Sequence, residues 1–206
     1  MNNVKVSSYS QETKEGDLLK INWILPTTKI SLDNNSWKKI LLLNKPEWII
    51  VSKSNNQGKS IYDILPDKYK NWYYIGRLDK NSCWLLLLAN DSALVNEYSH
   101  PSKKIEKEYE VTTNRKFTDD EISKSLKWII SLEDELSFKK IDFVWAISWK
   151  QDKFLYRIYL EEGKNRHIRR MFDYFWMKVF VLKRIREWDI VLWSIKSWDY
   201  KEINLL

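Results

Sequence analysis

Glycine is scarce in this chain: only 4 of its 206 residues are glycine, about 2% where about 7% is usual. The single cysteine, Cys83, excludes a disulfide framework and a thiolate metal cluster. The two histidines, His100 and His167, lie far apart in the sequence, which argues against a histidine-based metal site. No apolar run approaches the length that spans a membrane, and the polar N-terminus lacks a secretory signal. We therefore expect a cytoplasmic protein that binds no metal.

Positive charge is in excess, with 35 Lys and Arg against 28 Asp and Glu and a net charge of +7. An excess of this kind favours a polyanionic partner, and an aromatic content of 15% suits base stacking. Charge alone is equally compatible with a basic α+β protein that has no RNA role.

The pattern of apolar residues predicts an α+β fold, with one mixed or mostly antiparallel sheet and few helices. Helices are expected over 60–65, from 91 to about 98, from 118 to about 129, and at the start of 163–185, where Ile168, Met171, Phe172 and Phe175 form an apolar stripe. Strands are expected within 4–30 and 39–54 and over 72–75, 85–89, 107–113, 141–148 and 153–162, with a strand late in 163–185 and strands and turns beyond it. Residues 31–38 read as a polar linker.

Asp79 is the first candidate for chemistry, because it lies in a short loop between two apolar strands. The neighbouring cations Arg77 and Lys80 favour its ionised form, which a nucleophilic carboxylate requires. The position by itself is also typical of a turn aspartate that binds its own backbone.

Two other features stand out. Lys164, Arg166, Arg169 and Arg170 crowd the start of a helix, where cations oppose the helix dipole unless phosphate or a carboxylate offsets them. A solvated basic face is the alternative. Tyr109, in a strand, fits either core packing or stacking on a base.

Four segments of the chain form an ordered set of motifs: "LLLNKPEWIIVS", "GRLDKNSCWLLLLAND", "HPSKKIEKEYEV" and "EGKNRHIRRMFDYFWMKVFVLKRIR". In this order they resemble the RsuA-type ribosomal RNA pseudouridine synthases, and the resemblance covers about residues 39–205. It is greatest to the RluB branch, although the motifs also suit RluF-like members.

The resemblance implies a pseudouridine synthase fold with a central RNA-binding cleft. It also implies roles: Asp79 as the catalytic aspartate, Tyr109 as the residue that stacks on the base and is implicated in removal of the C5 proton, and Arg169 as the partner of the carboxylate. Arg77, Lys80, Lys164, Arg166 and Arg170 would face RNA. The implied activity is isomerisation of uridine to pseudouridine in ribosomal RNA, most similar to the large-subunit branch, with no cofactor. The implied partner is ribosomal RNA or a ribosomal subunit precursor, and we expect a monomer.

The resemblance divides the chain into two parts. Residues 1–35 are expected to be a remnant of an S4-like RNA-binding domain plus a linker, and residues 36–206 the catalytic domain. The alternative function is a non-catalytic RNA-binding or ribosome-assembly factor on the same fold.

Tryptophan is as abundant as glycine is scarce, with 12 residues. Trp23, Trp48, Trp72, Trp84, Trp176, Trp188 and Trp198 stand where turn chemistry or the resemblance predicts glycine. We interpret most or all of the twelve as glycine in the cell, encoded by UGA. A protein truly rich in tryptophan is the alternative.

Overall fold

The structure is a computed structural model and describes residues 38–204 with the exception of 55, 57, 133, 149–152 and 193. Within these residues the strands of the main sheet are β1 Lys39–Lys45, β2 Tyr73–Ile75, β3 Cys83–Ala89, β4 Lys107–Thr113, β7 Lys140–Ser148, β8 Lys153–Leu160, β9 Val179–Glu187, β10 Ile190–Val191 and β11 Tyr200–Asn204. A separate hairpin joins β5 Ile129–Ser131 to β6 Asp134–Leu136. The helices are α1 Ser92–Ser99, α2 Asp119–Lys127 and α3 His167–Tyr174, with 3-10 turns at Ile61–Asp63, Asp67–Tyr69 and Pro101–Lys103.

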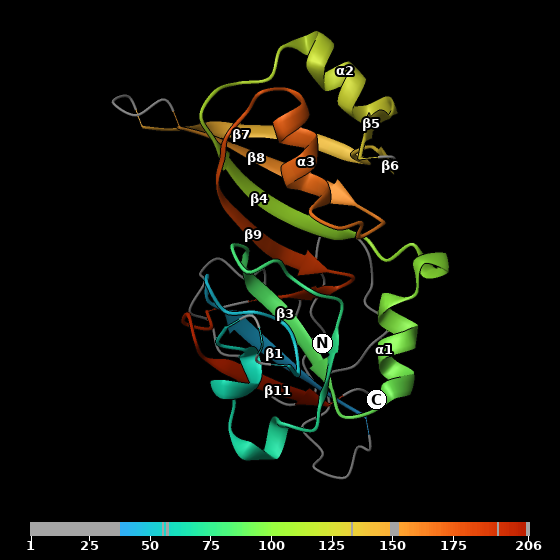
Figure 1. Cartoon of the computed structure of the whole chain (residues 1–206), viewed down its shortest axis with the longest axis vertical. Helices are drawn as coiled ribbons and strands as arrows, with labels where there is room; N and C mark the ends of the chain where they lie inside the picture. The colour runs from blue at the N-terminus through green and yellow to red at the C-terminus, as the bar shows by residue number, and fades with distance from the viewer. Residues whose placement is uncertain are drawn as a thin grey trace, which may run out of the picture.

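The main sheet is mixed and continuous through both halves of the molecule. Its order is β11-β1-β3-β9-β4-β8-β7, with β2 added to β3 and β10 to β9. The β3–β9 pair is parallel and short, joining only Cys83 to Lys183 and Trp84 to Arg184, whereas the other pairs are antiparallel. Figure 1 shows the result as two lobes: α2 and α3 accompany β4, β7 and β8 in one, and α1 accompanies β1, β3 and β11 in the other. The predicted α+β class and mixed sheet are confirmed.

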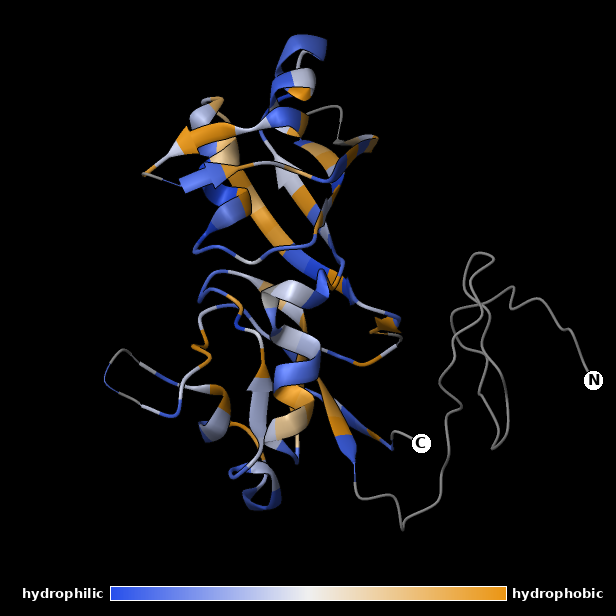
Figure 2. Cartoon of the chain, turned by 90° about the vertical axis from the view of Figure 1, so that its right-hand side faces the viewer, coloured by the Kyte–Doolittle hydropathy of each residue, from blue (hydrophilic) through white to orange (hydrophobic). Residues whose placement is uncertain are grey.

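The run of four leucines in β3 is explained by burial on both faces of the sheet. Leu86 and Leu88 belong to the larger apolar core, while Leu85 and Leu87 belong to a second core. A strand covered on both sides needs apolar residues at every position instead of alternate ones. Figure 2 colours the chain by hydropathy and shows apolar segments in both lobes.

The local signals at the helices are confirmed. Thr118 and Glu121 form a capping box at the start of α2, and Asp91 caps α1 through the main-chain N–H of Ala93. The apolar stripe on α3 is buried in the larger core, and it comprises Ile168, Met171, Phe172 and Phe175.

Several expected boundaries are wrong. Residues 49–54 form no second strand, because Ile50 makes only an isolated bridge to Ser60. The helix expected to reach about 129 ends at Lys127, since Trp128 is extended and leads into β5, which the sequence did not predict. The helix expected over 60–65 is a single 3-10 turn capped by Ser60. The strands expected within 4–30, and Trp23, lie outside the described residues.

Five tryptophans adopt the left-handed conformation that favours glycine. Their φ angles are 70° at Trp48, 85° at Trp84, 57° at Trp176, 54° at Trp188 and 77° at Trp198. A bulky residue is strained there, by roughly 1–3 kcal/mol each. All five are positions at which the sequence predicts glycine. Trp72, also named, does not share this conformation and packs edge-on against Tyr69 at 5.0 Å.

Candidate active site

The loop between β2 and β3 carries Asp79 next to the joint between the two lobes. Gly76 opens the loop with a φ of +63°, which glycine adopts without strain. At its other end the main-chain N–H of Ser82 donates to the carbonyl oxygen of Asp79 at 3.0 Å. The side chain of Asp79 is half-buried between buried Leu78 and exposed Lys80. The carboxylate is therefore fixed on a short loop and still reachable from solvent.

Lys45, the last residue of β1, contacts this loop from its buried side. Its ammonium group is fully buried and donates to the main-chain carbonyl oxygens of Pro46 at 3.0 Å, Asp79 at 3.3 Å and Ser82 at 2.8 Å. Burial lowers the pKa of Lys45 to about 8, although the negative charges of Cys83, Asp79 and Glu47 oppose the shift. Sequence reasoning missed this residue; the signal was a lysine that ends an apolar strand directly before a proline.

Tyr109 approaches Asp79 from β4. Its side chain is only 8% exposed, and burial raises the pKa of its hydroxyl. The guanidinium of Arg184 interacts with that hydroxyl and lowers the pKa, while Glu187 and Asp79 raise it further. The influence of Asp79 indicates that the two predicted catalytic side chains face a common space.

That space is a pocket of about 70 Å³. It is lined by Arg77, Leu78, Asp79, Ser82, Tyr109, Leu160, Gly163, Lys164, Arg166, His167, Ile168 and Leu182. The structure thus brings together Asp79, Tyr109 and three of the predicted RNA-facing cations, Arg77, Lys164 and Arg166. Leu78, Leu160, Ile168 and Leu182 provide apolar walls, so the pocket combines a carboxylate, a buried hydroxyl and several cations with an apolar lining.

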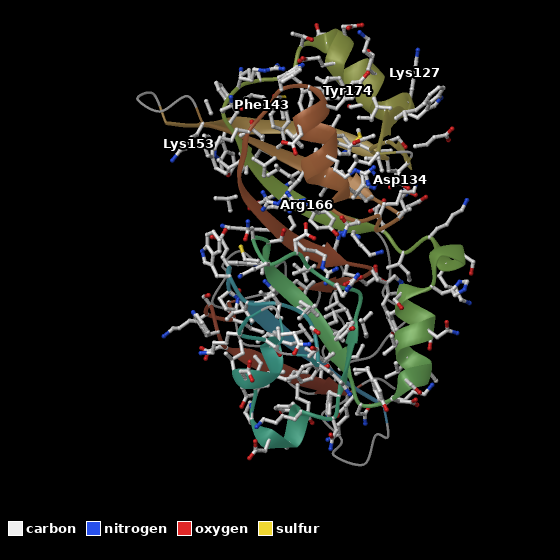
Figure 3. All side chains as sticks on the ribbon, viewed as in Figure 1. Lys127, Asp134, Phe143, Lys153, Arg166 and Tyr174 are labelled. Carbon is white, nitrogen blue, oxygen red and sulfur yellow. The ribbon has the colours of Figure 1, made fainter. Side chains whose placement is uncertain are left out.

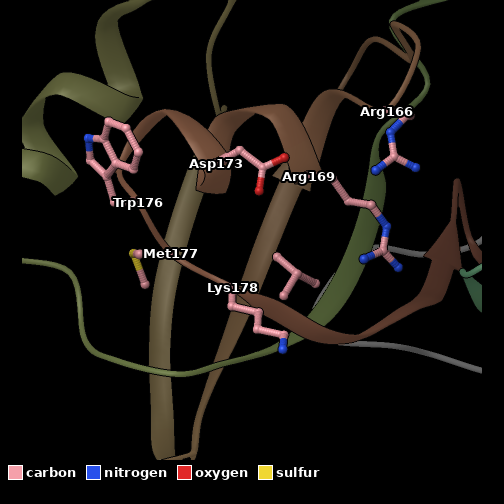
Figure 4. Close-up of a pocket in the computed structure, with 7 residues that line it drawn as sticks. Arg166, Arg169, Asp173, Trp176, Met177 and Lys178 are labelled. Carbon is pink, nitrogen blue, oxygen red and sulfur yellow. The ribbon is translucent and has the colours of Figure 1, made fainter.

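Arg166 lies where the two lobes meet (Figure 3) and adopts a left-handed conformation, with φ 48° and ψ 32°, immediately before α3. It lines a second, more open cavity of about 450 Å³ together with Arg169, Asp173, Trp176, Met177, Lys178 and Val179. Figure 4 shows the side chains of Arg166 and Arg169 adjacent in this cavity. A non-glycine residue in this conformation carries strain, and strain of this kind concentrates at functional sites.

The side chain of Arg169 supports the Asp79 loop by binding the main chain of the loop. Its guanidinium donates to the carbonyl oxygen of Asn81 at 2.6 Å. Among the residues that the structure describes, no ion pair within 4 Å joins this guanidinium to the carboxylate of Asp79. Burial and the charge of Arg166 lower the pKa of Arg169, and Asp79 opposes that shift. The expected pairing of Arg169 with Asp79 is therefore a through-space attraction in this structure.

Arg170 does not reach the pocket. It is 8% exposed and holds the β5–β6 hairpin against α3: it binds the carboxylate of Asp134 at 2.6 Å and the main-chain carbonyl oxygens of Ser131 and Asn165. Its guanidinium therefore binds protein partners and does not line the pocket. Lys80 is exposed at the outer side of the loop and does not line the pocket.

Two general findings bear on the chemistry. Among the described residues, no group of three or more His, Cys, Asp or Glu side chains is placed to hold a metal ion. None of the helices in the described part of the chain is long and apolar enough to cross a membrane.

Comparison with known proteins identifies the family. Residues 39–174 match the family model described as RNA pseudouridylate synthase, and the chain belongs to this family. A crystal structure of a pseudouridylate synthase superposes with a TM-score of 0.68 at 21% identity, covering 96% of this chain and 81% of that one, and confirms the fold.

Curated relatives carry the description ribosomal large subunit pseudouridine synthase B. The protein from Yersinia pestis is 32% identical over 200 residues, covering 91% of this chain and 61% of the relative. The protein from Haemophilus influenzae is 35% identical over 157 residues, covering 75% and 43%. The protein from Xylella fastidiosa strain 9a5c is 31% identical over 192 residues, covering 86% and 40%. This chain therefore spans between 40% and 61% of the length of these relatives.

Proposed function

We propose that the protein converts uridine to pseudouridine in ribosomal RNA of the large subunit. The observation that carries the proposal is the pocket shared by Asp79 and Tyr109, with Arg77, Lys164 and Arg166 around it. The relatives described as ribosomal large subunit pseudouridine synthase B suggest the class of RNA.

The reaction is balanced without a further reactant. The N1–C1′ and C5–H bonds of uridine break, and a C1′–C5 bond and an N1–H bond form. The target base must leave its stack to enter a pocket of this size. The cations at the rim would bind the phosphates on either side of it, and the apolar walls would receive the base.

Asp79 and Tyr109 divide the work in this proposal. Asp79, ionised and fixed by its loop, attacks or assists at the sugar or the base while the glycosidic bond breaks. Tyr109 stacks on the uracil and takes the proton from C5 after the ring has rejoined the sugar through that carbon. Arg169 holds the Asp79 loop through Asn81 and attracts the carboxylate through space. We further propose that the protein acts as a cytoplasmic monomer and that residues 36–206 are its catalytic domain.

Mapping of pseudouridine at nucleotide resolution tests the function. Unmodified ribosomal RNA transcripts and subunit particles are incubated with the folded protein, with Asp79→Ala, and with Asp67→Ala as a matched control. Asp67 is an exposed acid that pairs with Lys70 and does not line the pocket, so its variant should retain activity. We expect a new pseudouridine site that is lost in Asp79→Ala alone. RNA binding without modification by all three proteins would instead favour a non-catalytic assembly factor.

A further inference from the structure

A buried ion pair lies beneath the Asp79 loop and takes no part in the chemistry described above. The side chains of Arg184 and Glu187 are 1% and 0% exposed, and their charged groups approach to 3.1 Å. Both belong to β9, the strand that joins the two lobes through its parallel pairing with β3.

The pair is held from three sides. The Nε of Arg184 donates to the carbonyl oxygen of Leu85 at 2.9 Å, which fixes the guanidinium against β3. The ammonium of Lys107 lies 4.0 Å from the carboxylate of Glu187. A Cβ atom on Gly76 would lie 3.7 Å from both the guanidinium and the carboxylate, so the pair sits directly against the start of the Asp79 loop.

Arg184 also lies opposite Tyr109, the residue proposed to remove the C5 proton. It is the Cα partner of Tyr109 in the β4–β9 register, and its guanidinium interacts with the Tyr109 hydroxyl. Arg184 therefore binds the β3 backbone at the joint and lies at the strand position opposite Tyr109.

Stability is a poor explanation for such a pair. Desolvation of two charges offsets most of their attraction, so replacing a buried ion pair with apolar residues of similar size is often neutral or stabilising. The reason for placing it here is better sought in the adjacent hydroxyl.

We propose that Arg184, oriented by Glu187, is a positioning residue for Tyr109: its guanidinium, opposite Tyr109 in the β4–β9 pair, stabilises the phenolate that removes the C5 proton. This inference rests on the proposed function. In that step the C5–H bond breaks, its electron pair returns to the uracil ring, and the proton passes to the phenolate oxygen and later to solvent. The charge of Arg184 offsets the burial that otherwise favours the neutral hydroxyl.

Other charged groups around Tyr109 act on the same hydroxyl and must be kept constant. Asp79 and Arg77 approach from the β2–β3 loop, Lys164, Arg166 and His167 from the segment that enters α3, and Lys107 from β4 itself. Variants of Arg184 and Glu187 leave all of these in place.

The test uses the opposite effects of the two partners on Tyr109. Single-turnover rates of pseudouridine formation are measured against pH for the wild type, Arg184→Met, Arg184→Lys and Glu187→Gln. We expect Arg184→Met to slow the reaction about tenfold. The pH at which the rate rises should also increase by about one unit. Glu187→Gln should lower the pH at which the rate rises, because the negative charge that opposes the phenolate is removed. Arg184→Lys, which keeps the charge, should lie near the wild type.

Two further measurements separate this role from a structural one. RNA deuterated at C5 of uridine should show a larger isotope effect in Arg184→Met, because proton removal becomes slower. In a Tyr109→Phe background, Arg184→Met should add little to the loss of rate. Shifts in the same direction for both partner variants, or an equal loss in the Tyr109→Phe background, would overturn the proposal.

A direct titration keeps the inference independent of activity. Tyrosines labelled with ¹³C at Cζ report the ionisation of Tyr109, which is assigned by its loss in Tyr109→Phe. The titration should move upward in Arg184→Met and downward in Glu187→Gln even if no RNA is modified. Absence of pseudouridine in the wild type with these shifts present would refute the proposed function alone; unchanged titrations would refute the role of Arg184.

Discussion

The ammonium group of Lys45 lies 3.3 Å from the main-chain carbonyl oxygen of Asp79, on the buried side of the loop that presents the carboxylate. Lys45 ends β1 and Asp79 belongs to the β2–β3 loop, so the contact ties the loop to the end of β1. Because the same ammonium also binds the carbonyl oxygen of Ser82, one side chain holds both ends of the turn from Asp79 to Ser82.

Lys45→Met should misplace Asp79 without removing it. We expect kcat for pseudouridine formation to fall about 10- to 100-fold with little change in RNA affinity, because the carboxylate loses its fixed geometry. Lys39→Met is the matched control: Lys39 begins the same strand and pairs with Glu202, far from the loop. A loss of RNA binding equal to the loss of kcat would contradict this role.

The buried lysine also predicts a pH dependence of stability. The pKa of Lys45 is about 8 in the folded state and 10.5 for an ordinary lysine, so the unfolded chain binds more protons between these values. The free energy of unfolding should therefore gain about 3 kcal/mol from this group as pH rises from 8 to 10.5. Urea unfolding of the wild type and Lys45→Met over this range measures it; parallel curves for the two proteins would refute it.

His167 predicts a loss of stability in acid. Burial lowers its pKa to about 4 from the ordinary 6.5, so between these values the folded state holds it neutral while the unfolded chain binds a proton. The free energy of unfolding should fall by about 3 kcal/mol through this group as pH drops from 6.5 to 4. His167→Phe, which stacks an apolar ring near Phe138, should reduce that slope, and His100→Phe at an exposed position should not. Equal slopes in all three proteins would contradict the assignment.

Arg166 and Arg170 should respond differently although both were expected to face RNA. Arg166→Ala should weaken RNA binding and reduce the slope of log affinity against log salt by about 1, because one phosphate contact is lost. Arg170→Ala should keep that slope and instead lower the free energy of unfolding by roughly 1–3 kcal/mol, because the half-exposed Asp134 and the hairpin lose their partner. Filter binding at several salt concentrations and urea unfolding measure the two effects. A reduced salt slope in Arg170→Ala would restore it as an RNA contact.

Trp176→Gly should stabilise the protein. The side chain is 90% exposed at a φ of 57°, so glycine relieves strain of about 1 kcal/mol and loses almost no burial. Trp128→Gly is the control, because Trp128 is also exposed but has a φ of −171°, where glycine brings only added chain entropy. Thermal unfolding of both variants separates strain from the loss of an exposed ring. Peptide mass spectrometry of the native protein then decides whether tryptophan or glycine occupies positions 48, 84, 176, 188 and 198 in the cell.

Local patterns in the sequence determined much of the framework. The capping box at Thr118 and the apolar stripe of α3 depend on spacings of three and four residues, so a single segment contains the whole signal. The left-handed turns could be predicted because only glycine adopts this conformation without strain, and five tryptophans occupy such positions. Resemblance to the family predicted that Asp79 and Tyr109 act in one site. The periodicity of apolar residues does not predict that the two lie close together.

Tertiary structure alone decided what surrounds those two residues. Lys45 reaches the Asp79 loop, and Arg184 reaches Tyr109, only because β1 pairs with β3 and β9 joins β3 to β4. Arg170 looked like its neighbours in a basic segment, yet the side of α3 on which it lies commits it to the β5–β6 hairpin. The physical reason is that strand pairing and helix orientation depend on contacts between distant segments, which spacing along the chain does not encode.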